Sequence, residues 1–401
     1  MKRRFQVGDS RRLTRFATPP GQTDQRLSFR YSPVFPITNG WRYKVESYSI
    51  LNCGQRSALS ILVVCRSASS DLRLSPMPQT DRRLNADLPL VSVIIPFYNA
   101  DNLIGAALES VFAQSFKDFE VVVVNDGSPN NERLQKALSP YLSRITYLSQ
   151  EHQGPSAARN LAILRAHGEL LAFLDSDDTW LPEYLSEQTR LLQASPLMDL
   201  IFCDAFLVGD PASSGKTFMQ ICSSNGPVTF ESLLVEKTQV PTSGTVVRRQ
   251  CVIAAGLFDE KLQCAEDHDL WLRIAYHGGR IEYHRKVLFR RLVRPDSLGS
   301  PPGDLLAGEI AVLKKLGRNL ALPPETSSLL AGRLRKAEAL FDITQGKRRL
   351  LANDAQEARA FLSRANASFP TLKLRLLLTG LRRMPRLTLV AARMWYRLTS
   401  I

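Results

Sequence analysis

The sequence has no long apolar run and no patterned cysteines. Its longest early apolar run, residues 58–65, is far shorter than the roughly 20 residues that a helix needs to cross a bilayer. No apolar segment follows the basic N-terminus, so the pattern of a secretory signal is missing. The six cysteines show neither metal-ligand spacing nor a disulfide framework. These absences favour a reducing compartment, and we expect a cytoplasmic protein.

Two common ligand-binding motifs are also missing. Three acids lie within residues 175–178, but the glycine and the closing glutamate of an EF-hand loop are absent. The segment Ser214-Gly215-Lys216-Thr217 resembles the end of a P-loop. The preceding glycine, Gly209, leaves five residues between the two glycines, whereas the motif requires four. The sequence therefore argues against an EF-hand and against a P-loop NTPase.

Charge is distributed unevenly along the 401 residues, which carry a net charge of +14. Residues 1–85 hold 15 Lys and Arg against 5 Asp and Glu, and residues 305–401 hold 18 against 6. The middle of the chain holds 19 basic and 27 acidic residues. Basic flanks around an acidic middle favour solubility or contact with an anionic surface over sequence-specific reading of DNA. We expect no nucleic-acid partner.

The length allows two or three domains, and the composition suggests three regions. Residues 1–86 sustain neither a helical nor a strand period, and we predict a basic, disordered extension. Met77 shortly precedes the first convincing strand, so a chain that starts there is expected to fold and retain activity. Residues 87–304 are expected to form the domain that carries the chemistry. Residues 305–401 are predicted to form a basic helical region.

Strand and helix patterns alternate in the first half of the middle region. Residues 90–95 and 119–124 are rich in β-branched residues, and an amphipathic helical pattern lies between them. Further strands are predicted at 145–148 and 170–174, again separated by a helical pattern. Such alternation gives right-handed βαβ units. The predicted fold is α/β, with a mainly parallel, Rossmann-like sheet flanked by helices.

The second half of the chain has a mixed pattern and then becomes helical. Strands are predicted at 200–208, 244–248 and 281–289, and a helix is predicted at 265–276. The tail, residues 372–398, is rich in Leu and Arg and contains an adjacent Trp and Tyr. This composition fits a packed helix pair and equally fits a peripheral contact with an anionic membrane. Both interpretations of the tail remain open from the sequence.

An apolar strand that stops at three carboxylates is the most informative stretch. Asp175, Asp177 and Asp178 directly follow the strand predicted at 170–174. The carboxyl ends of parallel strands are where open α/β sheets bind ligands. Mg²⁺ or Mn²⁺ is held by one or two carboxylates together with phosphate oxygens, and crowded carboxylates repel each other without a cation. The stretch predicts a divalent metal site, although Asp178 or Thr179 could instead cap a helix that begins near residue 181.

Four other clusters have simple explanations when each is taken alone. Pro96–Asn99 and Asp126–Ser128 follow predicted strands and are typical of turns. Gly154–Asn160 is typical of a helix start that carries a surface Arg. The acids in Glu266–Asp269 open a helix, where they interact favourably with its dipole. Their order along the chain, rather than any one of them, is what carries information.

In that order the motifs resemble glycosyltransferase family 2, whose members have the A-type nucleotide-sugar fold. The matching pieces lie within residues 90–300 and read PFYN, VNDGS, GPSAARN, DSDDTW, GLFDE and EDHDLWLR. The resemblance implies inverting transfer of a sugar from a nucleotide-diphosphate sugar, expected to be a UDP-sugar. The implied acceptor is a hydroxyl of a glycan or of a lipid-linked molecule, in the synthesis of cell-surface polysaccharide.

The resemblance also implies roles for individual residues. Asp267 resembles the general base, with Glu266 beside it, and Asp175 and Asp177 would hold Mg²⁺ or Mn²⁺. Phe97 and Tyr98 would border the base of the nucleotide. The full set expected to bind the donor is Pro96, Phe97, Tyr98, Asn99, Asp126, Arg159, Asp175 and Arg294. Within the segment 290–297, which resembles the loop that closes over the diphosphate, Leu292 stands where many relatives have Arg. Either Arg291 or Arg294 could take the place of that Arg.

A different class of function fits the same composition. A catalytically idle protein of this fold could use its basic flanks as an adaptor that binds a membrane or nucleic acid. Salt-sensitive binding of nucleic acid without turnover of a nucleotide sugar would support that alternative. A nucleotidyltransferase on a similar fold is disfavoured, because the chain lacks a Gly-rich N-terminal loop with Arg or Lys. The preferred localisation is cytoplasmic, with peripheral contact at the inner face of the membrane.

Overall fold

The computed structural model describes residues 88–211, 213, 215–222, 224–294 and 302–399. The predicted disordered extension and Met77 lie outside these residues, as do residues 295–297 of the expected closing loop.

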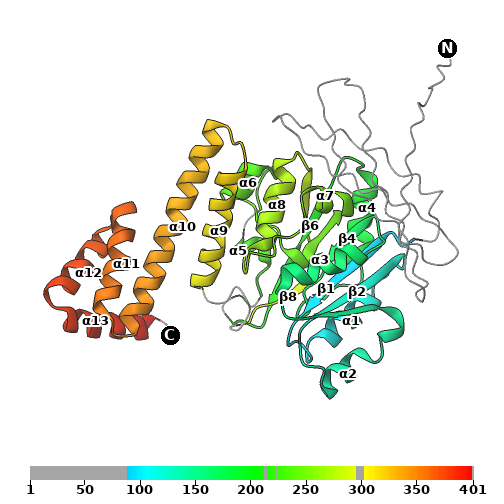
Figure 1. Cartoon of the computed structure of the whole chain (residues 1–401), viewed down its shortest axis with the longest axis horizontal. Coiled ribbons are helices and arrows are strands. Elements are labelled where there is room, and N and C mark those ends of the chain that lie inside the picture. Colours follow the sequence, from blue (N-terminus) through cyan, green and yellow to red (C-terminus); the bar gives the residue numbers. More distant parts are fainter. Residues whose placement is uncertain (1–87, 212, 214, 223, 295–301, 400–401) are drawn as a thin grey trace, which may run out of the picture. The chain divides into compact units, whose positions relative to one another are not determined.

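A mixed sheet forms the centre of the described fold (Figure 1). Its eight described strands are ordered β3-β2-β1-β4-β7-β6-β8-β5. The strands are β1 Val91–Phe97, β2 Phe119–Asp126, β3 Thr146–Gln150, β4 Leu170–Phe173, β5 Thr179–Trp180, β6 Leu200–Val208, β7 Thr245–Arg248 and β8 Ile281–Leu292. Every residue of β1 and of β4 is buried, as expected for strands covered on both faces. This confirms the predicted α/β class.

The first half of the sheet is parallel, and the second half is mixed. β1 pairs in parallel with β2 and β4, and β2 pairs in parallel with β3. β7 runs antiparallel to β4 and to β6, and β5 runs antiparallel to β8. The reason for the reversal at β7 is local. The turn before β7, Thr242–Gly244, lies at the carboxyl end of β4, so the chain can only return along β4 in the opposite direction.

The spacing of apolar residues explains why the helices form where they do. In α1, Ile104–Phe112, the residues at positions 104, 107, 108 and 111 are buried, which is the spacing of one helix face. The other described helices before residue 280 are α2 Glu132–Leu138, α3 Pro155–Arg165, α4 Tyr184–Ala194, α5 Phe218–Ile221, α6 Phe230–Leu234, α7 Arg249–Ala254 and α8 Glu266–Tyr276, with 3₁₀ turns η2 Leu142–Arg144 and η3 Thr242–Gly244.

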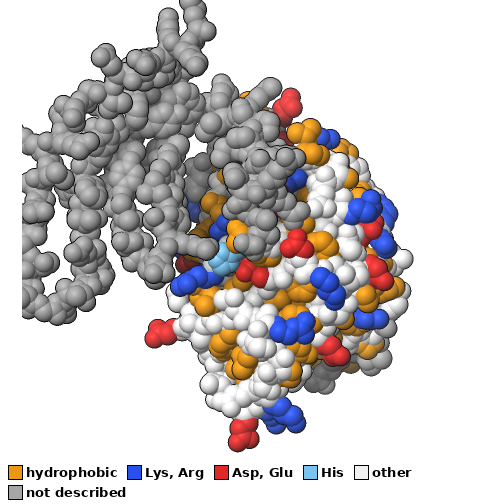
Figure 2. Space-filling model, turned by 90° about the vertical axis from the view of Figure 1, so that its right-hand side faces the viewer, with side chains coloured by type: hydrophobic (Ala, Val, Ile, Leu, Met, Phe, Trp, Pro, Cys, Tyr) orange, Lys and Arg blue, Asp and Glu red, His pale blue; other side chains and the backbone are white. Residues whose placement is uncertain are grey.

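On the face in Figure 2, basic and acidic side chains are interspersed, so the described part of this face forms no single basic area.

The C-terminal helices belong to two different apolar cores. They are α9 Pro302–Asn319, α10 Pro324–Leu351, α11 Ala355–Ser368, α12 Leu372–Arg383 and α13 Pro385–Thr399. Val312 of α9 and Leu330 of α10 are buried in the same core as the sheet. A second core begins with Leu350 at the end of α10 and includes Leu362 and Leu389. The change from one apolar core to the other therefore lies inside α10.

Among the described helices, none is both long enough and apolar enough to span a bilayer.

Candidate active site

The acidic loop, residues Asp175–Asp178, begins just after β4 at the carboxyl edge of the sheet. Asp178 is buried, and its Oδ1 accepts a hydrogen bond from the backbone N–H of Leu292 at 2.9 Å. Burial, with the nearby charges of Asp175 and Asp177, raises the pKa of Asp178 to about 8. Asp178 thus connects the loop to β8. The alternative in which Asp178 or Thr179 caps the next helix is wrong, because α4 begins only at Tyr184.

Asp175 and Asp177 each contact an arginine. Arg159 Nη2 lies 2.7 Å from Asp175 Oδ1, and Arg294 Nη2 lies 2.9 Å from Asp177 Oδ2. Burial and the charge of Asp175 raise the pKa of Asp177, and Arg294 opposes this shift. Both carboxylates remain partly exposed, at 36% and 20% of their side-chain surface. They are therefore accessible to a ligand at the sheet edge and repel each other.

These two residues fit a metal that is shared with a substrate. The described residues contain no group of three or more acidic, His or Cys side chains arranged to hold a metal ion. Mg²⁺, however, usually binds through one or two carboxylates and completes its shell with substrate phosphates and water. Asp175 and Asp177 supply two such oxygen ligands beside each other. The chemistry of the pair fits a divalent cation held jointly with a diphosphate.

Arg159 joins the acidic loop to the start of α8. Besides Asp175, its guanidinium contacts Glu266, with Nη1 lying 2.7 Å from Oε1. Burial would lower the pKa of Arg159, but the charges of Asp175 and Glu266 outweigh that effect and raise it. Arg159 is well placed for this because α3 starts cleanly after Gly154, which has a positive φ of 93°. Both terminal nitrogens contact carboxylates, and contact with a nucleotide remains a prediction for this residue.

Asp267 lies in the first turn of α8 and differs from its neighbours in how it is held. Its Oδ2 accepts a hydrogen bond from the Thr242 hydroxyl at 2.7 Å. In the part of the chain that the structure describes, it has no ion pair with Lys or Arg. The residue before the helix, Ala265, has a φ of 60°, a left-handed conformation that is strained for a residue with a side chain. Such strain is often found at functional sites.

Glu266 and Asp267 were both expected to be catalytic, and the geometry separates them. Glu266 is nearly buried and bound to Arg159. Burial is the main cause that raises the pKa of Glu266, with Arg159 acting against it and Asp267 adding to it. Asp267 is half-buried and held by a neutral hydroxyl. Of the two carboxylates, only Asp267 is free of an arginine in this arrangement.

Asp126 organises the turn that leads from β3 into α3. Its Oδ1 accepts hydrogen bonds from Gln150 Nε2 at 2.8 Å and from the Gln153 backbone at 2.9 Å. Its Oδ2 accepts the Gly154 N–H at 2.8 Å and lies 2.9 Å from His152 Nδ1. The buried carboxylate therefore fixes residues 150–154. A contact with the base or ribose of a nucleotide remains a prediction.

The four residues expected to border the donor at the end of β1 divide into two pairs. Pro96 and Phe97 belong to the buried strand, whereas Tyr98 and Asn99 are exposed. Tyr98 stacks on His152 with 4.0 Å between ring centroids. This pair forms an aromatic surface beside Asp126, suitable for stacking with a nucleotide base. Contact of Tyr98 with a nucleotide base stays a prediction, and sequence reasoning missed His152.

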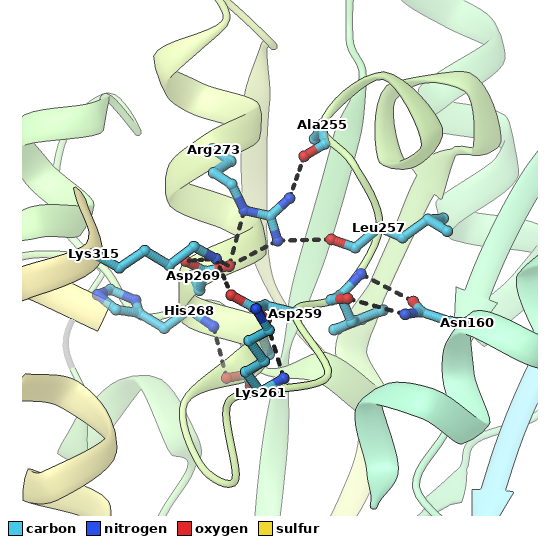
Figure 3. A network of polar contacts seen from close by, with 11 residues as sticks. Asn160, Ala255, Leu257, Asp259, Lys261, His268, Asp269, Arg273 and Lys315 are labelled. Carbon is cyan, nitrogen blue, oxygen red and sulfur yellow. Dashed lines mark hydrogen bonds and ion pairs between the residues drawn. The ribbon is translucent and has the colours of Figure 1, made fainter. Parts of the chain in front are cut away.

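A second polar network connects α8 with α9 and with the segment 255–259 (Figure 3). Arg273 donates to Asp269 Oδ2 at 2.8 Å and to the Leu257 carbonyl at 2.7 Å, and it also contacts the Ala255 carbonyl. Lys315 of α9 lies 2.6 Å from Asp259 Oδ2 and 2.9 Å from Asp269 Oδ1. The Asp269–Arg273 spacing of four residues was visible in the sequence. The partner from α9 was not, because it comes from the helical region.

Three features together define the class of protein. A mixed α/β sheet places two partly exposed carboxylates after β4, an aromatic surface just after β1 and β3, and a carboxylate at the start of α8. This is the A-type glycosyltransferase fold. Residues 92–211 match the family model described as "Glycosyl transferase family 2".

Sequence comparison gives relatives of the same class. The chain is 29% identical over 196 residues to an uncharacterized glycosyltransferase of Rickettsia felis, which covers 48% of this chain and 33% of the relative. A Rickettsia typhi glycosyltransferase is 29% identical over 47% of this chain and 59% of its own length. A shorter match, 41% identical over 104 residues, covers 26% of this chain and 41% of the Escherichia coli glucosyltransferase WfgD. The chain thus spans a third to three fifths of these relatives' length.

Solved structures support the fold. S. aureus TarS, residues 1–349, is 22% identical with a TM-score of 0.52, over 77% of this chain and 91% of that chain. The same protein in complex with UDP-GlcNAc is 24% identical with a TM-score of 0.52, over 77% of this chain and 92% of that chain. At these identities the likeness concerns the fold alone.

Proposed function

We propose that the chain is an inverting glycosyltransferase that moves a sugar from a nucleotide-diphosphate sugar to a hydroxyl acceptor. The observation that carries the proposal is the contrast at the sheet edge. Asp175, Asp177 and Glu266 are each bound to an arginine, whereas Asp267 accepts hydrogen bonds from the Thr242 hydroxyl and from the backbone N–H of the next residue. A carboxylate without a cationic partner is suited to receive a proton.

In the proposed mechanism Asp267 removes the proton of the acceptor hydroxyl as that oxygen attacks the anomeric carbon. The positive end of the α8 dipole favours the ionised carboxylate. The opposite side of the sugar carries the leaving diphosphate, so direct displacement inverts the anomeric carbon. Arg294, beside Asp177, is placed to stabilise the charge that develops on the diphosphate. Asp175 and Asp177 would hold a divalent cation, which would supply further stabilisation of that charge.

For the donor we propose a UDP-sugar. The stacked pair Tyr98 and His152 offers a surface for the base, and Asp126 anchors the turn beside it. The TarS structure named above holds UDP-GlcNAc, and the name of WfgD describes transfer from UDP-Glc to a diphosphoundecaprenol-linked sugar. These names support, for this chain, a UDP-sugar and a lipid-linked glycan acceptor in polysaccharide synthesis.

We also retain the proposal of a cytoplasmic protein with peripheral contact at the inner face of a membrane. In α13, Leu387, Val390 and Met394 are all exposed and lie on one helix face. The sequence after Glu357 contains nine Lys and Arg and no Asp or Glu. Basic helices with an exposed apolar face suit an anionic bilayer. Nucleic acid is a less suitable partner for this surface, because exposed apolar side chains make no favourable interaction with phosphate groups.

A donor screen with the purified chain tests the central proposal. Release of UDP, GDP or dTDP is followed for matching donor sugars, with Mg²⁺, with Mn²⁺ and with chelator. We expect release from a UDP-sugar that depends on the metal. No release from any donor, together with binding of nucleic acid or vesicles, would favour the idle adaptor.

A paired substitution tests the metal ligand. Asp177→Ala should abolish metal-dependent donor binding, because it removes one of two oxygen ligands. Glu169→Ala, at the other end of β4, is the matched control and should leave it unchanged. Normal turnover of Asp177→Ala, or indifference of the parent protein to chelator, would refute the assignment of the metal site.

A further inference from the structure

The 3₁₀ turn η3, Thr242–Gly244, is a feature that sequence reasoning did not single out. Thr242 and Ser243 are buried, at 7% and 2% relative exposure, although both carry hydroxyls. Buried hydroxyls are usually hydrogen-bonded, and these two are. The Thr242 hydroxyl donates to Asp267 Oδ2 at 2.7 Å, and the Ser243 hydroxyl accepts the Asp175 N–H at 3.1 Å. One short turn thus contacts the candidate base and the first residue of the acidic loop.

The turn is fixed on all sides. The Ser243 carbonyl accepts the indole N–H of Trp180 at 2.7 Å, and the Gly244 carbonyl accepts from Gln188 Nε2 at 2.8 Å. A Cβ on Gly244 would lie only 2.6 Å from the ring of Phe289. Close contacts of this kind leave the turn a single position relative to the sheet. The two hydroxyls therefore present their hydrogen bonds from a rigid support.

Asp267 depends on this support more than the other site carboxylates do. The side chains of Asp175, Asp177 and Glu266 are each held by a guanidinium. Asp267 has the Thr242 hydroxyl, and its Oδ1 accepts only the N–H of the next residue, His268, at 2.7 Å. A bond to the following backbone N–H moves with the residue itself. Thr242 is thus the contact from another part of the chain that fixes the direction of the carboxylate.

We infer that Thr242 is a positioning residue that orients Asp267, and that η3 sets the distance between this base and the acidic loop. The inference rests on the proposed function. Misplacement of a reacting group by about 1 Å can lower the rate by about a hundredfold. Loss of the hydroxyl therefore affects the chemical step, while the surfaces expected to bind the donor stay in place.

The first test is an isosteric substitution. Thr242→Val keeps the volume and removes the donor, and we expect kcat to fall roughly tenfold to a hundredfold with an unchanged KM for the donor sugar. Thr242→Ser restores the hydroxyl and should recover most of the loss. The control is Thr238→Val, four residues earlier, where a fully buried hydroxyl has no hydrogen-bond partner in the described residues. Parental kcat in Thr242→Val, or a failure of Ser to rescue, would overturn the inference.

The second test asks whether Thr242 acts through Asp267. In the Asp267→Asn background, Thr242→Val should add little further loss, because the group that it orients no longer takes the proton. Losses that multiply would show a merely structural role and would overturn the inference. A crystal structure of Thr242→Val gives a measurement independent of turnover, and an unchanged Asp267 side chain would also overturn it. If the parent protein transfers no sugar at all, the proposed function fails, and this structural comparison still decides the inference.

Discussion

The sheet edge and the C-terminal helices handle charge in opposite ways. At the edge, three buried or half-buried acids are matched with two arginines, because Arg159 serves two of the acids and Arg294 the third. In the tail, nine basic residues follow Glu357 without a single acid, and leucines such as Leu387 are exposed. A buried charge requires a partner inside the molecule, whereas an exposed charge does not. An acid without a basic partner at the sheet edge therefore indicates a reacting group. Basic residues without acidic partners in the tail indicate binding to another molecule.

The largest expected effect comes from the unmatched acid at the edge. Asp267→Asn keeps the shape of the side chain but cannot take a proton, so turnover should fall by roughly 10² to 10⁴. Asn is tolerated at a helix start about as well as Asp, so the free energy of unfolding should change little. Turnover and donor affinity are measured on the same purified variant. Near-parental transfer would remove Asp267 from the mechanism and direct attention to Glu266 or Asp269.

Removing Arg159, which pairs with two acids at the sheet edge, should destabilise the fold. Arg159→Met leaves Asp175 and Glu266 without their shared cation, which typically costs about 3–5 kcal/mol for a buried pair. Urea unfolding monitored by circular dichroism measures the loss. The control is Arg190→Met, whose side chain is 61% exposed beside Glu187, and it should cost about 1 kcal/mol or less. Equal losses in the two variants would contradict the assigned role of Arg159.

A third prediction concerns a buried cluster where one arginine serves two acids. Arg333 of α10 lies 2.6 Å from Glu309 of α9 and also contacts Glu236. Burial raises the pKa of Glu309 to about 7, with Glu236 adding to the shift and Arg333 opposing it. Because the folded-state pKa is raised, the stabilisation is fully present below pH ~4.5, where the unfolded group is also protonated, and is lost as the pH rises through ~7.

Glu309→Gln tests this pH dependence. The variant keeps a neutral side chain at every pH, so its stability relative to the parent should increase between pH ~4.5 and ~7, by roughly 2–3 kcal/mol. Urea unfolding at several pH values gives both curves. Parallel curves for the parent and the variant would show that Glu309 keeps an ordinary pKa.

The smallest expected effect concerns binding of the C-terminal helix α13 to an anionic membrane. The double substitution Leu387→Ser and Met394→Ser should weaken binding to vesicles of phosphatidylcholine with phosphatidylglycerol by about fivefold to tenfold, because apolar area is lost. Leu164→Ser is the control, since that leucine is 61% exposed in α3. Co-sedimentation at low and high salt, with phosphatidylcholine alone as reference, measures the effect. Binding that ignores lipid charge and salt would contradict a contact with an anionic membrane.

The sequence predicted the parts of the fold that local patterns determine. β1 and β2 contain runs of Val and Ile, β4 is a run of four apolar residues, and the acids follow β4 directly, as predicted. The antiparallel strand β7 was not predictable, because its direction depends on where η3 returns to the sheet. Thr242 was missed for the same reason: its partner, Asp267, is 25 residues away in sequence. Asp175 and Glu266, the two acids that Arg159 binds, likewise come from segments that only the fold brings together.

The division of cores within α10 has a mechanical consequence. The helix has 28 residues and is therefore a rod of roughly 42 Å, embedded at its start with Leu330 in one core and at its end with Leu350 in the other. No flexible linker separates the cores along this helix, so a protease has no exposed hinge to cut between them. A displacement of the second core would therefore be transmitted through α10 to the first core. A fragment that ends at residue 304 would also expose the apolar surface that Val312 covers.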